Sequence, residues 1–174
     1  MPVPEIPDVV RPNGNADYLE VITRAVFQAG VRWKQIADRW EAYRDAFEGF
    51  DVARVAAYDD IDIERVLGTP GVLRMRRKVI ATIANARALD AIDREHGSIA
   101  TYLQSFGSYD DLAADFRKRF SFMGEMNVWY FLFRIGEPVP RFEPWVETIR
   151  GDHPRMLEMV LQARARGCSP ERMD

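Results

Sequence analysis

Apolar residues recur every three or four positions along most of the chain, which is the spacing of amphipathic helices. Gly30 follows the first of these stripes, at a position where a helix can end. That stripe consists of Leu19, Ile22, Val26 and Ala29. A second stripe extends over residues 33–47. Because no convincing alternating run of β-branched residues is present, the pattern predicts an all-α protein.

Residues that favour helix ends divide the remainder of the chain. Asp51 and Asp60 can each cap a short helix. The longest expected helix carries apolar positions from Leu73 to Ile92, and Gly97 follows it where a left-handed residue is wanted. Further helices are expected in five segments: residues 99–106, 110–116, 125–135, 143–149 and 154–166.

Proline-rich sequence at the start of the chain predicts an extended segment. The prolines in question are Pro2, Pro4, Pro7 and Pro12. Since proline removes a backbone donor and clashes with a preceding helical turn, we expect residues 1–16 to form an extended arm. Residues 17–174 are expected to form a single all-α domain, because 174 residues with 47% hydrophobic content can supply one core.

Composition and charge narrow the class of protein. No apolar run approaches the roughly 18 residues of a membrane span, and no signal peptide is evident, so we expect a monomeric cytoplasmic protein without membrane contact. Cys168 is the only cysteine, which excludes an intramolecular disulfide and a cysteine-rich zinc site. The formal net charge is −3. Any DNA-binding surface must therefore be a local basic face.

A short turn around one glycine separates two of the expected helices at residues 119–127. Gly124 allows the backbone to approach a partner closely. The free N–H groups at the start of the following helix, together with its dipole, suit a phosphate. This helix-hairpin-helix geometry makes Met123, Gly124 and Glu125 candidate DNA contacts, although any pair of helices needs a turn.

Five segments between Tyr18 and Gly136 share one register with a known family. They are Gln28-Ala-Gly-Val-Arg-Trp33, Tyr43-Arg-Asp-Ala-Phe47, Gly71-Val-Leu-Arg74-Met-Arg-Arg-Lys78, Asn85-Ala-Arg-Ala88 and Phe120-Ser-Phe-Met-Gly124. These segments resemble the DNA-3-methyladenine glycosylase I family. The resemblance implies a helix-hairpin-helix DNA glycosylase-like helical domain. Its partner would be double-stranded DNA carrying a damaged base.

The resemblance also implies roles for residues of the first half. Trp33 would stack on a base flipped out of the duplex, and its electron-rich indole suits an alkylated, positively charged purine. Tyr18 and Trp129 could add to this pocket or belong to the core. The loop that would fill the gap left by the extruded base consists of Ala29, Gly30 and Val31.

Cleavage of an N-glycosidic bond builds positive charge on the sugar, which a carboxylate can stabilise. Counted from Gly136, Glu143 lies about where related glycosylases carry an aspartate, so it is the catalytic candidate. The competing interpretation is an acid at a helix N-terminus. The base-recognising glutamate of the family corresponds to Ala25, which leaves the identity of the base open. The family's zinc ligands have no counterparts, so no metal and no cofactor are expected.

Two further features bear on chemistry and DNA contact. Met126 stands where bifunctional relatives have a nucleophilic lysine, so we expect hydrolysis of the base without strand cleavage. Basic residues flank the hairpin and could contact phosphates, or they could form an ordinary solvated helix surface. The candidate phosphate contacts are Arg74, Arg77, Lys78 and Arg119.

Three functional hypotheses follow. The first is a monofunctional DNA repair glycosylase that removes alkylated purines such as 3-methyladenine by base flipping. The second is a non-catalytic helix-hairpin-helix module that senses damaged or distorted DNA. The third is a small-molecule hydrolase or scaffold that reuses the fold. Ala25 and the acidic charge balance keep the second and third hypotheses open.

Overall fold

The computed structural model describes residues 4–172, and the regular structure within this range is helical. The all-α prediction is confirmed. The elements in chain order are α1 (Asn15–Gln28), α2 (Trp33–Ala37), α3 (Trp40–Ala46), the 3-10 helix η1 (Glu48–Phe50), α4 (Val52–Ala56), α5 (Asp60–Leu67), α6 (Arg76–His96), α7 (Ile99–Gln104), α8 (Tyr109–Arg119), α9 (Glu125–Arg134), α10 (Phe142–Val146) and α11 (Pro154–Ala165).

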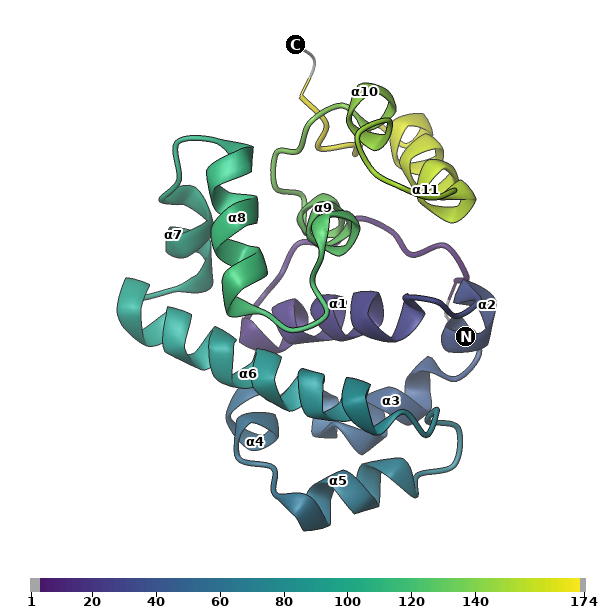
Figure 1. The fold of residues 1–174 in the computed structure, drawn as a ribbon, viewed down its shortest axis with the longest axis vertical. Helices are drawn as coiled ribbons and strands as arrows, with labels where there is room; N and C mark the ends of the chain where they lie inside the picture. Colours follow the sequence, from purple (N-terminus) through teal and green to yellow (C-terminus); the bar gives the residue numbers. More distant parts are fainter. Residues whose placement is uncertain (1–3, 173–174) are drawn as a thin grey trace.

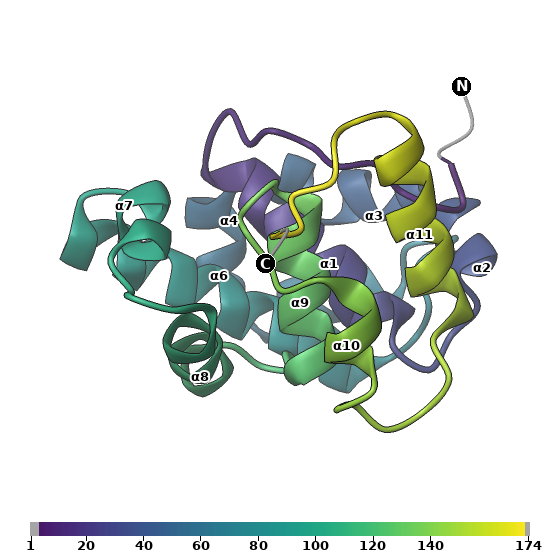
Figure 2. The same cartoon turned by 90° about the horizontal axis from the view of Figure 1, so that it is seen from above.

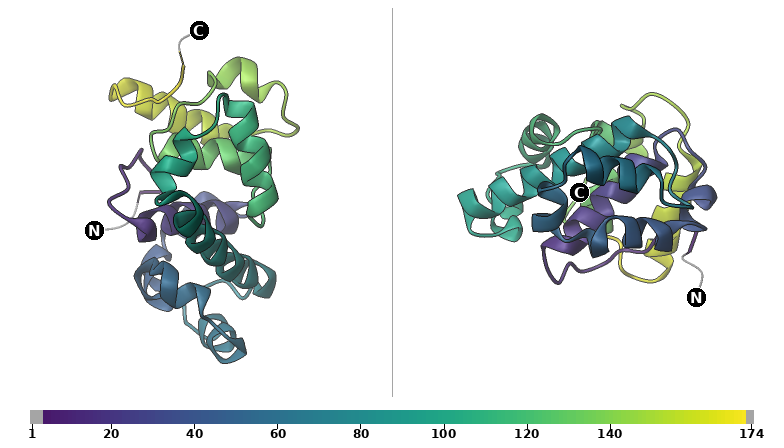
Figure 3. Two further views of the ribbon diagram at one scale, coloured as in Figure 1. Left: turned by 90° about the vertical axis from the view of Figure 1, so that its left-hand side faces the viewer. Right: turned by 90° about the horizontal axis from the view of Figure 1, so that it is seen from below.

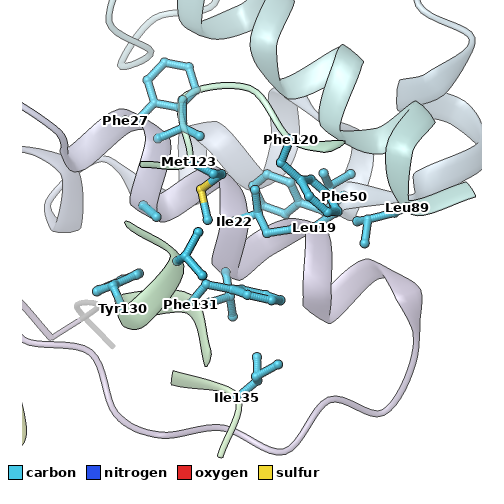
Figure 4. Close-up of a cluster of buried hydrophobic side chains, with 14 of the residues drawn as sticks. Leu19, Ile22, Phe27, Phe50, Leu89, Phe120, Met123, Tyr130, Phe131 and Ile135 are labelled. Carbon is cyan, nitrogen blue, oxygen red and sulfur yellow. The ribbon is translucent and has the colours of Figure 1, made fainter. Parts of the chain in front are cut away.

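Helices α1 and α9 lie near the middle of the molecule and pack against each other (Figure 1). The long helix α6 also packs on α1, while α3, α4 and α5 lie at one end and α10 and α11 at the other, as the views of Figure 3 confirm. Leu19 and Ile22 of α1 point toward Phe131 of α9 in a buried cluster (Figure 4). Burying apolar area at such a junction is the main force that holds the two halves together.

Local sequence explains most of the helix boundaries. The side chain of Asp51 accepts a hydrogen bond from the backbone N–H of Arg54, as the expected cap of α4. Gly97 adopts a left-handed conformation with φ of 82° and ends α6 as predicted. Ser98 likewise caps α7. Two expected caps are displaced: Asp59 rather than Asp60 caps α5, and Ser108 precedes α8.

The second apolar stripe is divided between two helices. The chain leaves helical geometry at Arg39, so α2 ends before α3 begins. Trp40 and Tyr43 stack on each other with ring centroids 5.2 Å apart. Both are buried against α1, whereas Trp33 at the start of α2 stays half-buried. The break therefore separates a core-forming helix from one whose first aromatic ring faces a surface cleft.

The segment before α1 follows the surface in extended conformation, and α1 itself begins at Asn15. Two buried arginines donate hydrogen bonds to backbone carbonyls of this segment: Arg24 to Pro4 and Arg134 to Asp8. Such contacts tie the segment to α1 and α9. Residues 1–3 of the expected arm lie outside the described residues.

The C-terminal part of the chain forms a further layer beside α9, with α11 next to α2 when the molecule is seen from above (Figure 2). The chain then turns back, and Val139 and Glu171 form an isolated parallel bridge. Arg164 of α11 donates hydrogen bonds to the carboxylates of Glu143 and Glu171, which connects α10, α11 and the last described residues. Among residues 4–172, no helix combines the length and the apolar character needed to cross a membrane.

Candidate functional site

A cleft of about 1490 Å³ lies between three parts of the chain that are distant in sequence. One wall comes from the end of α1 and from α2, and a second from the start of α9. The third comes from residues 148–156, which include the connection after α10 and the first turn of α11. Trp33 and Gly124 both line this cleft. The hairpin and the indole that the sequence singled out therefore lie on one side of the molecule.

Aromatic side chains from two helices meet in the cleft. The indole of Trp33 packs edge-on against the ring of Tyr130, with centroids 5.7 Å apart. Tyr130 is buried on α9, and its hydroxyl accepts a hydrogen bond from Arg134. Trp33 remains half-buried and lines the cleft, so part of the indole is accessible to a ligand. An accessible indole of this kind can hold a planar base by stacking.

Ala29, Gly30 and Val31 form a short loop directly beside this aromatic pair, and all three line the cleft. Gly30 has φ of 75°, a left-handed conformation that favours glycine. Lys78, which reaches the loop from α6, donates hydrogen bonds to the carbonyls of Ala29 at 2.7 Å and Phe27 at 3.3 Å. These two hydrogen bonds hold the loop against α6.

This position of Lys78 corrects one prediction. Its side chain is buried, with 5% of the residue exposed, and burial lowers the pKa of the ammonium group. The expected contact of Lys78 with a DNA phosphate is therefore not supported, because the ammonium group donates to backbone carbonyls inside the protein. The neighbouring residues Arg74 and Arg77 are exposed and remain available for phosphates.

The hairpin between α8 and α9 is fixed by a buried asparagine. Asn85 of α6 donates to the carbonyl of Ser121 and accepts from the backbone N–H of the same residue, at 3.1 and 2.7 Å. The left-handed residue of the turn is Phe122, with φ of 58°, whereas Gly124 has φ of −78°. Glycine at 124 is thus not required by backbone conformation. A Cβ at Gly124 would meet nothing within 4 Å, which leaves the backbone open to a partner.

The residues that flank Gly124 differ in what they expose. Met123 is buried, and its side chain points into the core cluster shown in Figure 4. Only its backbone could contact DNA. Glu125 is exposed at the start of α9, lines the cleft and pairs with Arg117 at 3.5 Å. Its charge competes with a phosphate for the positive end of the helix.

Arg119 differs from the free basic residues that were expected beside the hairpin. Its guanidinium donates to Asp115 at 2.8 Å and to Glu95 at 3.1 Å. It also lies over the ring of Tyr102. Since two carboxylates already neutralise this charge, the predicted phosphate contact of Arg119 is not supported. Four exposed arginines that the sequence analysis had not selected line the cleft instead: Arg32, Arg39, Arg150 and Arg155. Of these, Arg155 is paired with Glu5 and Glu158.

The structure gives no support to the catalytic prediction for Glu143. Its carboxylate forms a two-pronged ion pair with Arg164, at 2.7 and 2.6 Å, and it is not among the residues that line the cleft. The Arg164 hydrogen bonds lower the pKa of Glu143 to about 2. The competing interpretation, an acid in the first turn of a helix, describes its position in α10. Glu137, whose pKa is raised by burial, also lies outside the cleft lining.

Tyr18 and Trp129 belong to the core rather than to the cleft. Trp129 is fully buried, stacks between Phe133 and Trp145, and donates its indole N–H to the carbonyl of Pro140. Tyr18 is half-buried and packs against Phe131. Neither lines the cleft, so their predicted roles in base binding are not supported.

Sequence reasoning missed the third wall of the cleft and two residues of its inner surface. Residues 148–156 carry no motif, and their placement opposite Trp33 follows from the packing of α11. Gln28 was noted only as part of a matching segment, and Tyr130 only as part of an apolar helix. Their position on the facing surfaces of α1 and α9 could have been inferred from helical periodicity once the two helices were paired.

The described residues do not fit a zinc site. Within 4–172, no group of three or more histidine, cysteine, aspartate or glutamate side chains could hold a metal ion. His153 lines the cleft, but its Nε2 lies 2.9 Å from the carbonyl of Arg150. Cys168 is an exposed free thiol.

Comparison with known proteins places these features in context. The crystal structure of a 3-methyladenine DNA glycosylase I has the same fold, with a TM-score of 0.63 and 31% identity, over 73% of this chain and 81% of that chain. DNA-3-methyladenine glycosylase 1 of Escherichia coli (strain K12) is 35% identical over 79 residues, 45% of this chain and 42% of that protein. DNA-3-methyladenine glycosylase of Haemophilus influenzae is 30% identical over 88 residues, 51% of this chain and 48% of that protein. The chain thus matches about half the length of these curated relatives.

A helical bundle with an aromatic cleft beside a hairpin turn defines a protein of the DNA glycosylase fold class. The methyladenine glycosylase family model matches residues 10–128, which is more than half of the chain. The chain belongs to this family. The match ends inside α9, so residues 148–156 of the cleft lie beyond it.

Proposed function

We propose that this protein is a monofunctional DNA glycosylase that hydrolyses the N-glycosidic bond of alkylated purines such as 3-methyladenine in double-stranded DNA. One observation carries the proposal. A single cleft brings together an open indole face at Trp33, the loop at Gly30 and the free start of α9 behind Gly124. These are the three parts that base flipping needs: a stacking surface, a residue group to fill the vacated space, and an anchor for the backbone.

The chemistry proposed for the cleft relies on the leaving group. An alkylated purine carries positive charge, so departure of the neutral base from the sugar is easier than for an unmodified purine. The electron-rich faces of Trp33 and Tyr130 attract such a cation. The cleft would hold the base in position while water attacks the sugar carbon, the glycosidic electron pair leaves with the base, and the water loses a proton to solvent.

The absence of a lysine nucleophile in the hairpin favours hydrolysis alone. Met126 lines the cleft at the position considered for that lysine. Lys34, the lysine that lines the cleft, is paired with Asp38, so a Schiff base and strand cleavage are not expected. Because one chain supplies every wall of the cleft, we also propose that the active species is a monomer, and that it acts in the cytoplasm.

The proposal is tested by incubating the purified protein with methylated DNA and measuring free base by chromatography. The wild-type protein should release methylated purine without nicking the strand. Trp33→Ala should reduce the rate at least about fivefold, since loss of one base-stacking contact costs roughly 1–3 kcal/mol. Glu143→Gln is the matched control and should release base at the wild-type rate, because Glu143 lies outside the cleft.

Ala25 supports a second candidate function, a non-catalytic sensor of damaged DNA. The resemblance places a base-recognising glutamate at this position, whereas Ala25 lines the cleft without a polar group. Salt-sensitive DNA binding by the wild-type protein with no base release would favour the sensor and reject the glycosylase. Absence of DNA binding at low salt would reject both.

A further inference from the structure

Gln28 has an unusual environment for a polar side chain. Only 4% of the residue is exposed, and among the described residues neither the amide oxygen nor the amide nitrogen has a hydrogen-bond partner. Buried polar groups are nearly always paired, because each unmet donor or acceptor costs about 1–3 kcal/mol. An amide left unpaired on both atoms therefore needs an explanation, and a ligand that completes the pairing is one.

The position of Gln28 directs this explanation to the cleft. Gln28 lies one turn after Ala25 on the same face of α1, and both residues line the cleft. Trp33 and Tyr130, the aromatic pair of the proposed base site, line it as well. A planar ligand stacked on the indole of Trp33 would therefore occupy the cleft that Gln28 also lines.

The carboxylates that line the cleft are mostly engaged with cationic side chains. Three of the carboxylates that line the cleft are engaged in ion pairs: Glu5 with Arg155, Asp38 with Lys34 and Glu125 with Arg117. Asp152 is exposed. Ala25 adds no polar group. The neutral amide of Gln28 is thus the hydrogen-bonding side chain that the inner end of α1 offers to a base.

The chemistry of a carboxamide selects among bases. Its oxygen accepts and its nitrogen donates, side by side and in one plane. Adenine presents the matching pair, an amino donor at N6 beside an acceptor at N7, whereas guanine presents two acceptors, O6 and N7. A methyl group at N3 of adenine leaves the N6 and N7 edge free.

We propose that Gln28 is a specificity-determining residue that reads the N6 and N7 edge of a flipped adenine-type base. The inference rests on the proposed function for the site but not on catalysis. It assigns to an amide on α1 the recognition that a carboxylate at position 25 would otherwise perform. The chain would therefore prefer alkylated adenine to alkylated guanine.

The test uses the free bases 3-methyladenine and 7-methylguanine as probes in titrations followed by ¹⁵N–¹H spectra of the whole chain. The Gln28 amide pair is identified by its loss in Gln28→Leu. In the wild-type protein, the two amide signals of Gln28 should shift when 3-methyladenine is added. 3-Methyladenine should also bind about tenfold or more tightly than 7-methylguanine, which is the discrimination between bases expected of one bidentate contact. Gln28→Leu should abolish the preference and leave 7-methylguanine binding unchanged.

A structural role for Gln28 predicts a different result. Since leucine removes an unpaired buried amide, Gln28→Leu should melt at a higher temperature than the wild type if the amide serves a ligand. A lower melting temperature together with an unchanged base preference would overturn the proposal. Gln28→Glu, which retains the acceptor but loses the donor to N7, repeats the binding test if the leucine variant does not fold.

Catalysis is measured separately so that the two proposals can fail independently. A wild-type protein that prefers 3-methyladenine through Gln28 but releases no base from methylated DNA would reject the glycosylase and keep the role of Gln28. Release of both methylated purines at ratios that Gln28→Leu does not change would reject the role of Gln28 and keep the glycosylase.

Discussion

At the scale of single residues, neighbours in the sequence take opposite roles. Arg77 and Lys78 are adjacent in one basic cluster, yet Arg77 is exposed over the ring of Phe122 while Lys78 is buried under the loop at Ala29. Composition alone treats the two charges as equivalent. The helix rotates by about 100° between consecutive residues, so one faces solvent and the other faces α1.

This difference is measurable in the salt dependence of DNA binding. Arg77→Gln should reduce the slope of log K against log salt concentration by about 0.9, as expected for one lost phosphate contact. Lys78→Met should leave the slope unchanged, although it lowers affinity by loosening the loop. Binding isotherms at several salt concentrations, with folding of each variant checked by circular dichroism, measure both effects. An equal reduction of the slope in Lys78→Met would show that the ammonium contacts DNA after all.

Aromatic residues illustrate how far the sequence leads at this scale. Trp33 and Trp129 both lie on apolar helix faces, and of the two only Trp33, the leading candidate from the family resemblance, lines the cleft. The fates of Tyr18 and Trp129 depend on how α9 and α10 pack, which no local pattern encodes. The pairing of Glu143 with Arg164 could not be predicted for the same reason, because the two residues are distant in the sequence.

At the scale of elements, the prediction of helices succeeded where local chemistry decides. Asp51, Ser98 and Gly97 end or begin helices through contacts with residues close in the chain. The break at Arg39 was not foreseen, because the apolar period continues through it. The hairpin was located correctly, but the residue that bears its left-handed conformation is Phe122 and not the glycine.

The conformation of Phe122 predicts a stability difference between two substitutions. A left-handed conformation costs an L-residue roughly 1–2 kcal/mol, and glycine avoids this cost while losing some entropy. Phe122→Gly should therefore be more stable to urea than Phe122→Ala by about 1 kcal/mol. Both variants lose the ring under Arg77, so that contact cancels in the comparison. An alanine variant at least as stable as the glycine variant would show that the turn relaxes.

At the scale of the whole molecule, the family match ends at residue 128, before the residues that form the third wall of the cleft. Residues 148–156 reach the cleft because α10 and α11 are held against the rest of the chain. Arg164 is central to this arrangement, since it pairs with Glu143 of α10 and with Glu171. The side chain of Glu171 is 4% exposed and also accepts a hydrogen bond from the backbone N–H of Phe142.

The acid response of the protein should reveal this ion-pair network. Hydrogen bonds from Arg164 lower the pKa of Glu143 to about 2, and those from Arg164, Ser169 and the backbone outweigh burial and lower that of Glu171. A carboxylate with a lowered pKa in the folded state stabilises the protein above its ordinary pKa, and this stabilisation disappears as the pH falls toward the lowered value. The wild-type protein should therefore lose this contribution between about pH 4.5 and pH 2.

Arg164→Met isolates the contribution because it removes the shared partner of both carboxylates. At pH 7 we expect a loss of about 2 kcal/mol in the free energy of unfolding, between the small value of an exposed pair and the larger one of a buried pair. The loss should be smaller at pH 3, because part of the stabilisation by Glu143 and Glu171 is then already absent from the wild type. Arg155→Met is the control: its partners Glu5 and Glu158 are 33% and 44% exposed, so its effect should be smaller. Urea unfolding of the wild type and both variants at pH 7 and pH 3 gives the loss in unfolding free energy for each variant at each pH. If the loss for Arg164→Met is equal at pH 7 and pH 3, packing and not charge holds α11 beside the cleft.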